Sequence, residues 1–391
     1  SYLLTEFLPS NKTSLKAPTL FVKVRDVYNK LTPHYPWLRA KAGEVKYEVT
    51  PQDEDVALCI MLNTYVDDFV PSLKTREAAV NIRDKVQIAF SQLGFTFKGV
   101  HLAGPSEPVD PDREPESLLG YLYNFQEDSI QIKFRVNLSP KKRSARSQPD
   151  LTEDEELKGI QFTPSSLLSL QASQYDPVGL ASCFLVKGKL LISAVAKKQI
   201  GWKSPLDEED QKATLKYAQE LLSLVRDPPV FPRCVHSVGS SLTRLVIFAD
   251  ASSSALHVTM YGIFTSPTGG VETSLLKAKS AICHRSVPAN ELFALLAANR
   301  ILNGYIHATD PSTLKDVAIL SDSQCSLDQL SPEYLARDVV TRNKLAEIWK
   351  SHSRSKIPIL YYHLPTHLMG PADAGTRSDC PPQSGSRVPS S

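Results

Sequence analysis

The sequence predicts an α/β protein, and three patterns carry that prediction. Residues 242–250, 257–264 and 271–282 form apolar, strand-like runs separated by short turns, as in an antiparallel meander. A helix, strand, helix, strand and helix pattern follows, which favours a mixed sheet between helices. Residues 164–225 show apolar residues at helical spacing, with Ser and Thr at candidate caps.

The N-terminal half has a smaller α+β pattern of its own. An apolar run over residues 56–70 is interrupted by the sequence YVDD at residues 65–68, which predicts a hairpin with two carboxylates at its turn. A helix over residues 76–93 and a strand over residues 94–100 are expected to follow. Residues 1–50 match no pattern and stay unassigned.

Changes in composition mark the connections. Residues 105–115 are rich in proline and acid, and residues 140–149 are basic. The basic segment either contacts phosphate or is a solvated, mobile connector. Residues 227–232, with the sequence DPPVFP, are expected to end the helical region and to link it to the C-terminal part. The polar, proline-rich tail beyond Arg377 predicts disorder.

Four acidic residues of the C-terminal part carry the most information about function. Asp250 and Asp322 each end a buried-strand pattern, whereas Glu291 opens an apolar helix pattern. Asp373 follows the last strand pattern, at residues 357–363. A cap or a turn explains any one of them alone. Together, two adjacent strand ends and two helix starts can bring four carboxylates to one point.

A cluster of four carboxylates predicts a metal site, because like charges are unfavourable together unless cations neutralise them. Oxygen-only ligands select Mg²⁺ or Mn²⁺ over zinc. Two such ions form the usual apparatus for in-line attack on a phosphodiester. The sequence therefore indicates a metal-dependent nuclease.

The order and setting of these carboxylates resemble the ribonuclease H family. In that family an Asp on the first strand, a Glu on the first helix, an Asp ending the fourth strand and an Asp beginning the final helix form the site. The segments IFADAS, PANELFALLAA, ILSDSQCSL and YYHLPTHLMGPADAGTR hold those places here. The resemblance implies that Asp250 bridges two ions, with Glu291 and Asp322 on one and Asp373 on the other. His363, ten residues before Asp373, stands where the family carries a mobile His that is thought to help product release.

The YVDD sequence resembles the YxDD motif of reverse transcriptases, in which the Asp pair holds metal ions for nucleotide addition. The resemblance implies that Asp67 and Asp68 are metal ligands in part of a polymerase palm. A tight Asp-Asp turn in an ordinary hairpin is the alternative. Relatives need a third palm carboxylate farther upstream than the 64 residues before Tyr65 allow, and the strand-like candidate Asp26 is too close. Polymerase activity is therefore not expected of this chain alone.

The stretch between the two motifs resembles the Bel/Pao class of long-terminal-repeat retrotransposons. Those polyproteins carry L-G-x-x-W-N, then Y-D-P-x-G, then a helix that contains Trp. Their places are held here by LLGYLYN at residues 118–124, with Tyr123 for the usual Trp, by YDPVG at residues 175–179, and by Trp202. The region is known as a Pao retrotransposon peptidase. Aspartic proteases of the retroviral type need Asp-Thr-Gly or Asp-Ser-Gly, and neither occurs in this sequence.

These resemblances divide the chain into five parts. We expect an unassigned segment at 1–50, a partial reverse transcriptase palm at 51–104, a Pao-type connection region at 116–232, a ribonuclease H-like domain at 240–378 and a disordered tail at 379–391.

Composition limits the partners and the location. No apolar run reaches 18 residues, so we expect no membrane-spanning helix. The first residues lack the basic start of a secretory signal and the six cysteines form no CxxC pair, so we expect an intracellular protein that is not secreted. The net charge is only +2, so nucleic-acid binding must come from local patches. Lys277, Lys279 and Arg285 either contact phosphates or are solvated charges.

The expected function is a metal-dependent ribonuclease H-like nuclease that acts on the RNA strand of RNA–DNA hybrids, attached to an incomplete RNA-directed DNA polymerase palm. Two ions, Mg²⁺ or Mn²⁺, are the expected cofactors. One alternative is a catalytically inactive retroelement remnant that binds nucleic acid or a protein partner. An aspartic peptidase is a second and weaker alternative.

Overall fold

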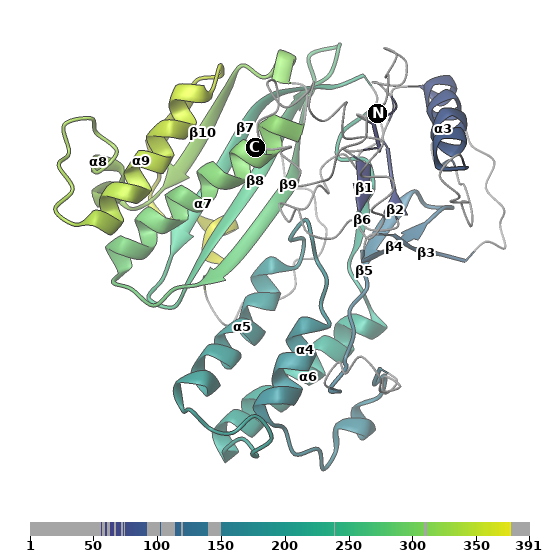
Figure 1. Cartoon of the computed structure of the whole chain (residues 1–391), viewed down its shortest axis with the longest axis vertical. Helices are drawn as coiled ribbons and strands as arrows, with labels where there is room; N and C mark the ends of the chain where they lie inside the picture. Colours follow the sequence, from purple (N-terminus) through teal and green to yellow (C-terminus); the bar gives the residue numbers. More distant parts are fainter. Residues whose placement is uncertain are drawn as a thin grey trace, which may run out of the picture. The chain divides into compact units, whose positions relative to one another are not determined.

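A computed structural model gives the fold (Figure 1). The structure describes residues 56, 59–60, 63–65, 68–71, 73, 75–91, 102, 114–118, 120–139, 150–237, 239–308 and 311–376. The predictions for residues 1–50, the strand at 94–100, the basic segment at 140–149 and the tail beyond Arg377 lie outside this part, as does most of the predicted loop at 105–115. The described residues divide into two compact units, one largely N-terminal and one holding most residues from Ser129 onward.

The first unit contains the YVDD hairpin and one amphipathic helix. Strands β1 (Thr64–Tyr65) and β2 (Asp68–Phe69) pair antiparallel, with Tyr65 opposite Asp68. Helix α3 (Arg76–Ser91) confirms the helix predicted from residue 76. Val56, Ile60 and Val86 are buried together, and Phe69 packs against them. Strand β3 (Glu116–Leu118) also lies in this unit.

The helical region of the second unit consists of three helices, α4 (Pro164–Ala172), α5 (Ser182–Lys197) and α6 (Glu208–Arg226). The first break has a local cause, since the Asp176 carboxylate accepts hydrogen bonds from the backbone N–H groups of residues 179–181, before α5 begins. Thr163 and Asp207 cap α4 and α6 by accepting from backbone N–H groups. Trp202 was expected on a helix, but it lies in the loop between α5 and α6 and is 66% exposed.

The segment predicted to be a linker before the sheet contains a short strand. Strand β6 (Val230–Pro232) pairs antiparallel with β5 (Ser129–Ile132), and Phe231 lies opposite Ile130. Two prolines follow the end of α6 and favour extended backbone, which fits the strand that begins at Val230. Strand β4 (Tyr121–Asn124) and the 3₁₀ turn η2 (Asp154–Leu157) complete this part.

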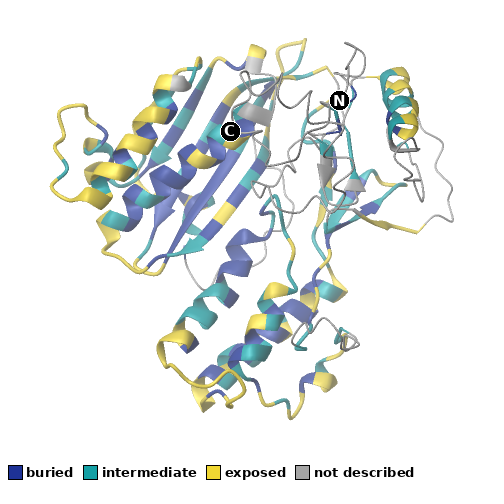
Figure 2. Cartoon of the chain, viewed as in Figure 1, coloured by how far each residue is buried: buried dark blue, intermediate teal, exposed yellow. Residues whose placement is uncertain are grey.

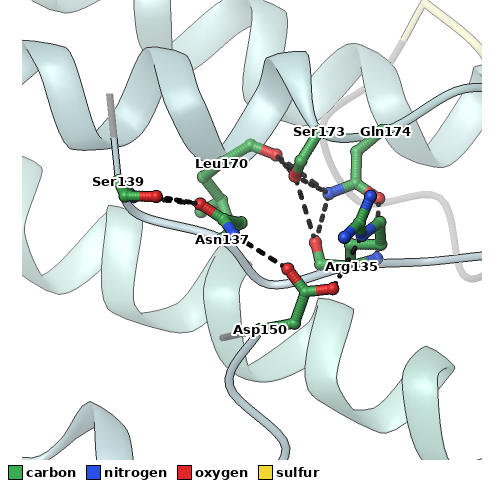
Figure 3. Close-up of polar contacts among 7 residues, drawn as sticks. All are labelled: Arg135, Asn137, Ser139, Asp150, Leu170, Ser173 and Gln174. Atoms are coloured by element: carbon green, nitrogen blue, oxygen red, sulfur yellow. Dashed lines mark hydrogen bonds and ion pairs between the residues drawn. The ribbon is translucent and has the colours of Figure 1, made fainter. Parts of the chain in front are cut away.

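A network of side chains joins the segment after β5 to the end of α4, as Figure 3 shows. Arg135 Nε and Asn137 Nδ2 donate to the two oxygens of Asp150, at 2.7 and 2.9 Å. Gln174 Nε2 donates to the carbonyl oxygen of Arg135 at 2.5 Å. The two described ends of the 140–149 segment are therefore held together beside α4.

The C-terminal part forms a five-stranded mixed sheet in the order β11-β10-β7-β8-β9. Strands β7 (Ser241–Ala251), β8 (Ala255–Thr265) and β9 (Val271–Ile282) form the predicted antiparallel meander. Strand β10 (Asp316–Ser321) runs parallel to both β7 and β11 (Ile359–His363). The α/β class is confirmed, and the sheet holds much of the buried core (Figure 2).

Helices α7 (Val287–Ala308) and α9 (Val339–Arg354) lie side by side, joined by the Arg300–Glu347 ion pair at 2.7 Å. Asn299 of α7 donates to the Tyr361 hydroxyl on β11 at 2.8 Å, which ties α7 to the sheet. Shorter elements are η3 (Pro311–Thr313), α8 (Gln324–Asp328), η4 (Thr366–Leu368) and α10 (Gly370–Asp373). None of the helices in the described ranges is long and apolar enough to cross a membrane.

Candidate active site

Two parallel neighbouring strands bring Asp250 and Asp322 to one edge of the sheet. Asp250 is the penultimate residue of β7, and Asp322 directly follows β10. Because β7 and β10 run parallel, their carboxyl ends meet at this edge. Glu291 reaches the same point from α7. One carboxylate oxygen from each of the three residues lies within 4.8 Å of the others.

Two of the four predicted carboxylates, Glu291 and Asp373, lie at other positions in their helices than predicted. Helix α7 begins at Val287, so Glu291 lies in its second turn and does not open the helix. Asp373 was expected to begin a helix, but it is the last residue of the four-residue helix α10. The helix starts earlier in both cases because a proline, Pro288 or Pro371, stands in the first turn, where its fixed φ favours helix and its missing N–H is not needed.

The electrostatics of the cluster fit a hard divalent cation. Glu291 is only 6% exposed, and burial raises the pKa of its carboxyl to about 8, with smaller contributions from Asp250 and Asp322. Burial also raises the pKa of Asp250. Glu291 Oε2 is buried and has no hydrogen-bond partner among the described residues. The cluster therefore offers only oxygen ligands, which are close together, desolvated and in part without a hydrogen-bond donor. Mg²⁺ or Mn²⁺ would coordinate such oxygens.

Asp373 is near the three clustered carboxylates but is not among those within 4.8 Å of one another. Its negative charge contributes to the raised pKa of Asp250. Thr376 connects the two, because its Oγ1 lies 3.0 Å from Asp250 Oδ2 and 3.0 Å from the Asp373 carbonyl oxygen. This hydroxyl donates to the buried carboxylate and lowers its pKa, opposing the effect of burial.

His363 and Thr366 both contact Asp322. His363 is the last residue of β11 and is exposed, and its Nε2 lies 3.1 Å from the backbone carbonyl oxygen of Asp322. Thr366 Oγ1 donates to Asp322 Oδ2 at 2.7 Å. The predicted histidine therefore lies beside the cluster, in contact with the backbone of one of its members.

A buried histidine that the sequence analysis missed lies on the strand next to Asp250. His257 pairs across the sheet with Asp250 and is 2% exposed. Its Nδ1 lies 3.1 Å from the Ala372 carbonyl oxygen, and its Nε2 lies 2.9 Å from Ser182 Oγ. Burial lowers the pKa of His257 to about 4. The sequence signal was weak, because His257 is one of several polar residues in β8, among them Thr259.

The predicted cations lie on β9 and on the segment that precedes α7. Lys277 is half-buried, whereas Lys279 and Arg285 are exposed. A groove of about 1010 Å³ runs beside Arg285 between α5 and the end of β9. Its described lining includes Lys189, Lys197 and Arg285, as well as Ser253 and Ser254 of the turn after Asp250, and no carboxylate.

One buried amide ties the walls of this groove to the cluster. Asn290, the residue before Glu291, is 1% exposed. Its Nδ2 donates to the carbonyl oxygens of Ser252 and Arg285, at 3.0 and 3.1 Å. Arg285, which lines the groove, is therefore tied through Asn290 to the residue next to Glu291. The other predicted metal ligands, Asp67 and the carboxylate of Asp68, lie outside the part of the chain that the structure describes.

The fold and the carboxylate cluster define an α/β protein with a ribonuclease H-like sheet. Residues 163–323 match the family model described as the Pao retrotransposon-like RNaseH-like domain, which confirms the resemblance to a Bel/Pao-type retrotransposon Pol fragment. The match crosses the predicted boundary between residues 232 and 240, so the α4–α6 helices and strands β7 to β10 fall in one family match, whereas β11 lies outside it. Its description names an RNaseH-like domain and no peptidase. Three of the four predicted carboxylates lie inside it.

Parts of the chain are similar to solved structures of two RNase H1 proteins and of a foamy viral protein. The RNase H1 of the halophilic archaeon Halobacterium salinarum NRC-1 shares 20% identity over 34% of this chain and 92% of its own, with a TM-score of 0.26. LC11-RNase H1, isolated from compost by a metagenomic approach, shares 18% identity over 34% of this chain and 91% of its own, with a TM-score of 0.27. The foamy viral protease-reverse transcriptase shares 13% identity over 79% of this chain and 47% of its own, with a TM-score of 0.43. No curated protein matches the chain.

Proposed function

We propose that this chain carries a metal-dependent nuclease of the ribonuclease H type, which cuts the RNA strand of an RNA–DNA hybrid. The convergence of Asp250, Glu291 and Asp322 within 4.8 Å is the observation that carries the proposal. Three carboxylates from separate elements, two of them nearly buried, are unfavourable together without a cation. The Pao-type RNaseH-like family match over the same residues supports the reaction class.

Asp250, Glu291 and Asp322 would hold the cation, with Asp373 available to a second one. Bound divalent ions would activate water for attack on the phosphodiester and stabilise the leaving oxygen. The protein's own contribution is orientation. Asp250 is fixed by the hydroxyl of Thr376, and Asp322 by that of Thr366. Such contacts keep each carboxylate aimed at the cluster.

The groove beside Arg285 supports nucleic acid as the partner. Lys197 and Arg285 are exposed at its walls, and the serines of the 252–254 turn add hydroxyl donors. Phosphate contacts of this kind position a nucleic acid without reading its sequence. A preference for RNA would then come from A-like geometry and the 2′-hydroxyl groups of the bound strand.

The YVDD hairpin would belong to a polymerase palm remnant that takes no part in the cleavage. The carboxylates that carry the proposal come from β7, α7 and the end of β10. We also propose an intracellular location, which the cysteine pattern favours.

The test is cleavage of a hybrid whose two strands carry different fluorescent labels, with Mg²⁺, with Mn²⁺ and with EDTA. We expect cutting of the RNA strand with either ion and none with EDTA, while a DNA duplex of the same sequence stays intact. A folded chain that cuts nothing with either ion would overturn the nuclease and favour a remnant that only binds. Equal cutting with EDTA would remove the metal from the proposal.

A further inference from the structure

We propose that Ser182 and His257 position helix α10, and with it Asp373 and Thr376, on the carboxylate cluster. The start of the connection helix α5 would thereby be a working part of the nuclease. This inference rests on the proposed function and deepens it. It assigns two positioning residues that do not touch the cation or the substrate.

The hydrogen bonds of His257 have one consistent proton assignment. The Ala372 carbonyl oxygen at 3.1 Å can only accept, so Nδ1 must donate to it. In a neutral imidazole Nε2 is then an acceptor, so Ser182 Oγ donates to it at 2.9 Å. All three residues are buried, so the loss of either hydrogen bond would leave an unsatisfied buried polar group and destabilise the folded state. The ring thus joins α5 to the residue directly before Asp373.

Ser182 is held in place independently of the histidine. The Ser280 hydroxyl on β9 donates to the Ser182 carbonyl oxygen at 2.9 Å. Lys189 Nζ, two turns along α5, donates to the Ser280 carbonyl oxygen at 2.9 Å. Ahead of the helix, the Ala278 N–H donates to the Val178 carbonyl oxygen at 2.9 Å. The beginning of α5 is therefore fixed on β9 by several contacts.

The close approach at residue 179 supports the same interface. A Cβ at Gly179 would lie 1.9 Å from the Ala278 carbonyl oxygen, and the residue has a φ of +89°. Only glycine combines that conformation with so close an approach to β9. The local backbone is therefore shaped to bring Ser182 against the sheet.

Helix α10 needs external support, because four residues are too few to be stable as a helix. Its contacts with the sheet supply that support. Ala372 is buried, its carbonyl oxygen accepts from His257, and Thr376 donates to Asp250. The ring of His257 also lies flat against Gly375, where a Cβ would come within 2.0 Å of the imidazole Cγ. The position of Asp373 therefore depends on where the imidazole stands.

Two isosteric replacements separate positioning from ordinary core packing. His257→Asn places an amide N–H near the position of Nδ1, so the bond to Ala372 is kept and the bond to Ser182 is lost. His257→Gln places its amide near Nε2, so the Ser182 side is kept and the Ala372 side is lost. Asn is one methylene shorter than Gln and leaves the larger cavity. A packing role therefore predicts the greater loss in His257→Asn, whereas positioning through Ala372 predicts the greater loss in His257→Gln.

The experiment measures hydrogen exchange of residues 369–376 together with kcat and KM for hybrid cleavage. We expect faster exchange and a kcat lowered about tenfold at unchanged KM in His257→Gln, with His257→Asn closer to the native chain. Ser182→Ala, which leaves the sheet intact, should raise exchange in the same residues by a smaller factor. Exchange in β7 serves as the internal control, since it reports whether the whole sheet has loosened.

A loss in His257→Asn equal to or greater than that in His257→Gln, or unchanged exchange of residues 369–376 in both, would overturn the inference. If both histidine variants fail to fold, the Ser182→Ala exchange result decides. Failure of the proposed function is distinguishable from either outcome. In that case the native chain cuts no hybrid, while the exchange pattern of residues 369–376 still tests the positioning.

Discussion

The chain contains two acidic motifs that look alike as metal sites, one made of residues adjacent in sequence and the other assembled by the fold. Asp67 and Asp68 are neighbours in sequence, next to a hairpin in which Tyr65 pairs with Asp68. Asp250, Glu291 and Asp322 are far apart in sequence, yet their oxygens lie within 4.8 Å. Adjacent carboxylates need no fold to be adjacent. A cluster assembled from two strands and a helix persists against its own repulsion only because the surrounding structure holds it.

The largest effect should come from neutralising the centre of the cluster. Asp250→Asn removes a charged metal ligand, so cleavage should fall by about three orders of magnitude, several kcal/mol of transition-state stabilisation. The amide oxygen still accepts from Thr376. The metal-free variant should unfold at the same denaturant concentration as the native chain or a higher one, because a repulsive charge is gone. Normal cleavage by this variant would place the active centre elsewhere.

The raised pKa of Glu291 gives the next largest effect, on cation binding. Below pH 8 this carboxyl holds a proton in the metal-free protein, since its pKa is raised to about 8 from an ordinary value of 4.5. A cation must displace that proton, so the affinity for Mn²⁺ should fall about tenfold for each unit of pH below 8. Calorimetry in two buffers of different ionisation enthalpy should show about one proton released at pH 7. The slope should flatten in Glu291→Gln.

The same shift sets the sign of a stability change without metal. The unfolded chain loses the Glu291 proton near pH 4.5, whereas the folded chain keeps it to about pH 8. Between these values the unfolded state binds fewer protons, so the contribution of this group to stability falls as the pH rises. Denaturant titrations of the native chain and of Glu291→Gln should converge below pH 5. A native chain that gains stability relative to Glu291→Gln as the pH rises toward 8 would contradict the raised pKa.

A smaller effect should follow from the hydroxyl that joins the cluster to α10. Thr376→Val keeps the shape of the side chain and removes the donor to Asp250 Oδ2. We expect kcat to fall about tenfold with KM nearly unchanged, because the lost contact orients a metal ligand and does not bind the hybrid. Thr376→Ser restores the hydroxyl and is the matched control. A loss that Ser does not rescue would point to packing.

Local patterns predicted much of this fold, and they failed where distant residues decide. The apolar runs and the turns between them located β7, β8 and β9 to within a few residues, because strands that are buried on both faces appear as nearly continuous apolar stretches. The meeting of Asp250 with Asp322 followed from parallel strands that share an edge. The first break in the helical region depends on one carboxylate, that of Asp176, which accepts from three N–H groups, and periodicity does not report such a contact.

The contacts that complete the candidate site were not predictable in the same way. Thr376 bonds to a carboxylate 126 residues away, and His257 bonds to a carbonyl oxygen 115 residues away. Neither residue stands in a pattern that distinguishes it from an ordinary surface threonine or a core histidine. Their roles depend on tertiary register, which places Asp250 opposite His257. Side chains that orient metal ligands are therefore found from the fold, whereas the candidate metal ligands themselves were found at the ends of strand patterns and the starts of helix patterns.

The groove beside Arg285 offers a modest test of nucleic-acid binding by the second unit. Lys197 is the last residue of α5 and lines the groove, and Lys216 is exposed on α6, away from its lining. Lys197→Glu should weaken hybrid binding in EDTA several-fold. The slope of the logarithm of the binding constant against the logarithm of the salt concentration should become smaller by about one to two. Lys216→Glu makes the same charge change and should have little effect. Equal losses in both would indicate only a general response to net charge.

The smallest expected effect returns to the other acidic motif. Asp67→Asn and Asp68→Asn should leave hybrid cleavage within about twofold of the native rate, because these carboxylates belong to a different unit from the cluster. Each change should be measured in the full chain beside Asp250→Asn, so that one preparation of hybrid serves all three. A loss from either variant comparable to that of Asp250→Asn would mean that the sequence-adjacent pair takes part in cleavage. The contrast between the two motifs would then fail, and the nuclease would have to be assigned to both units together.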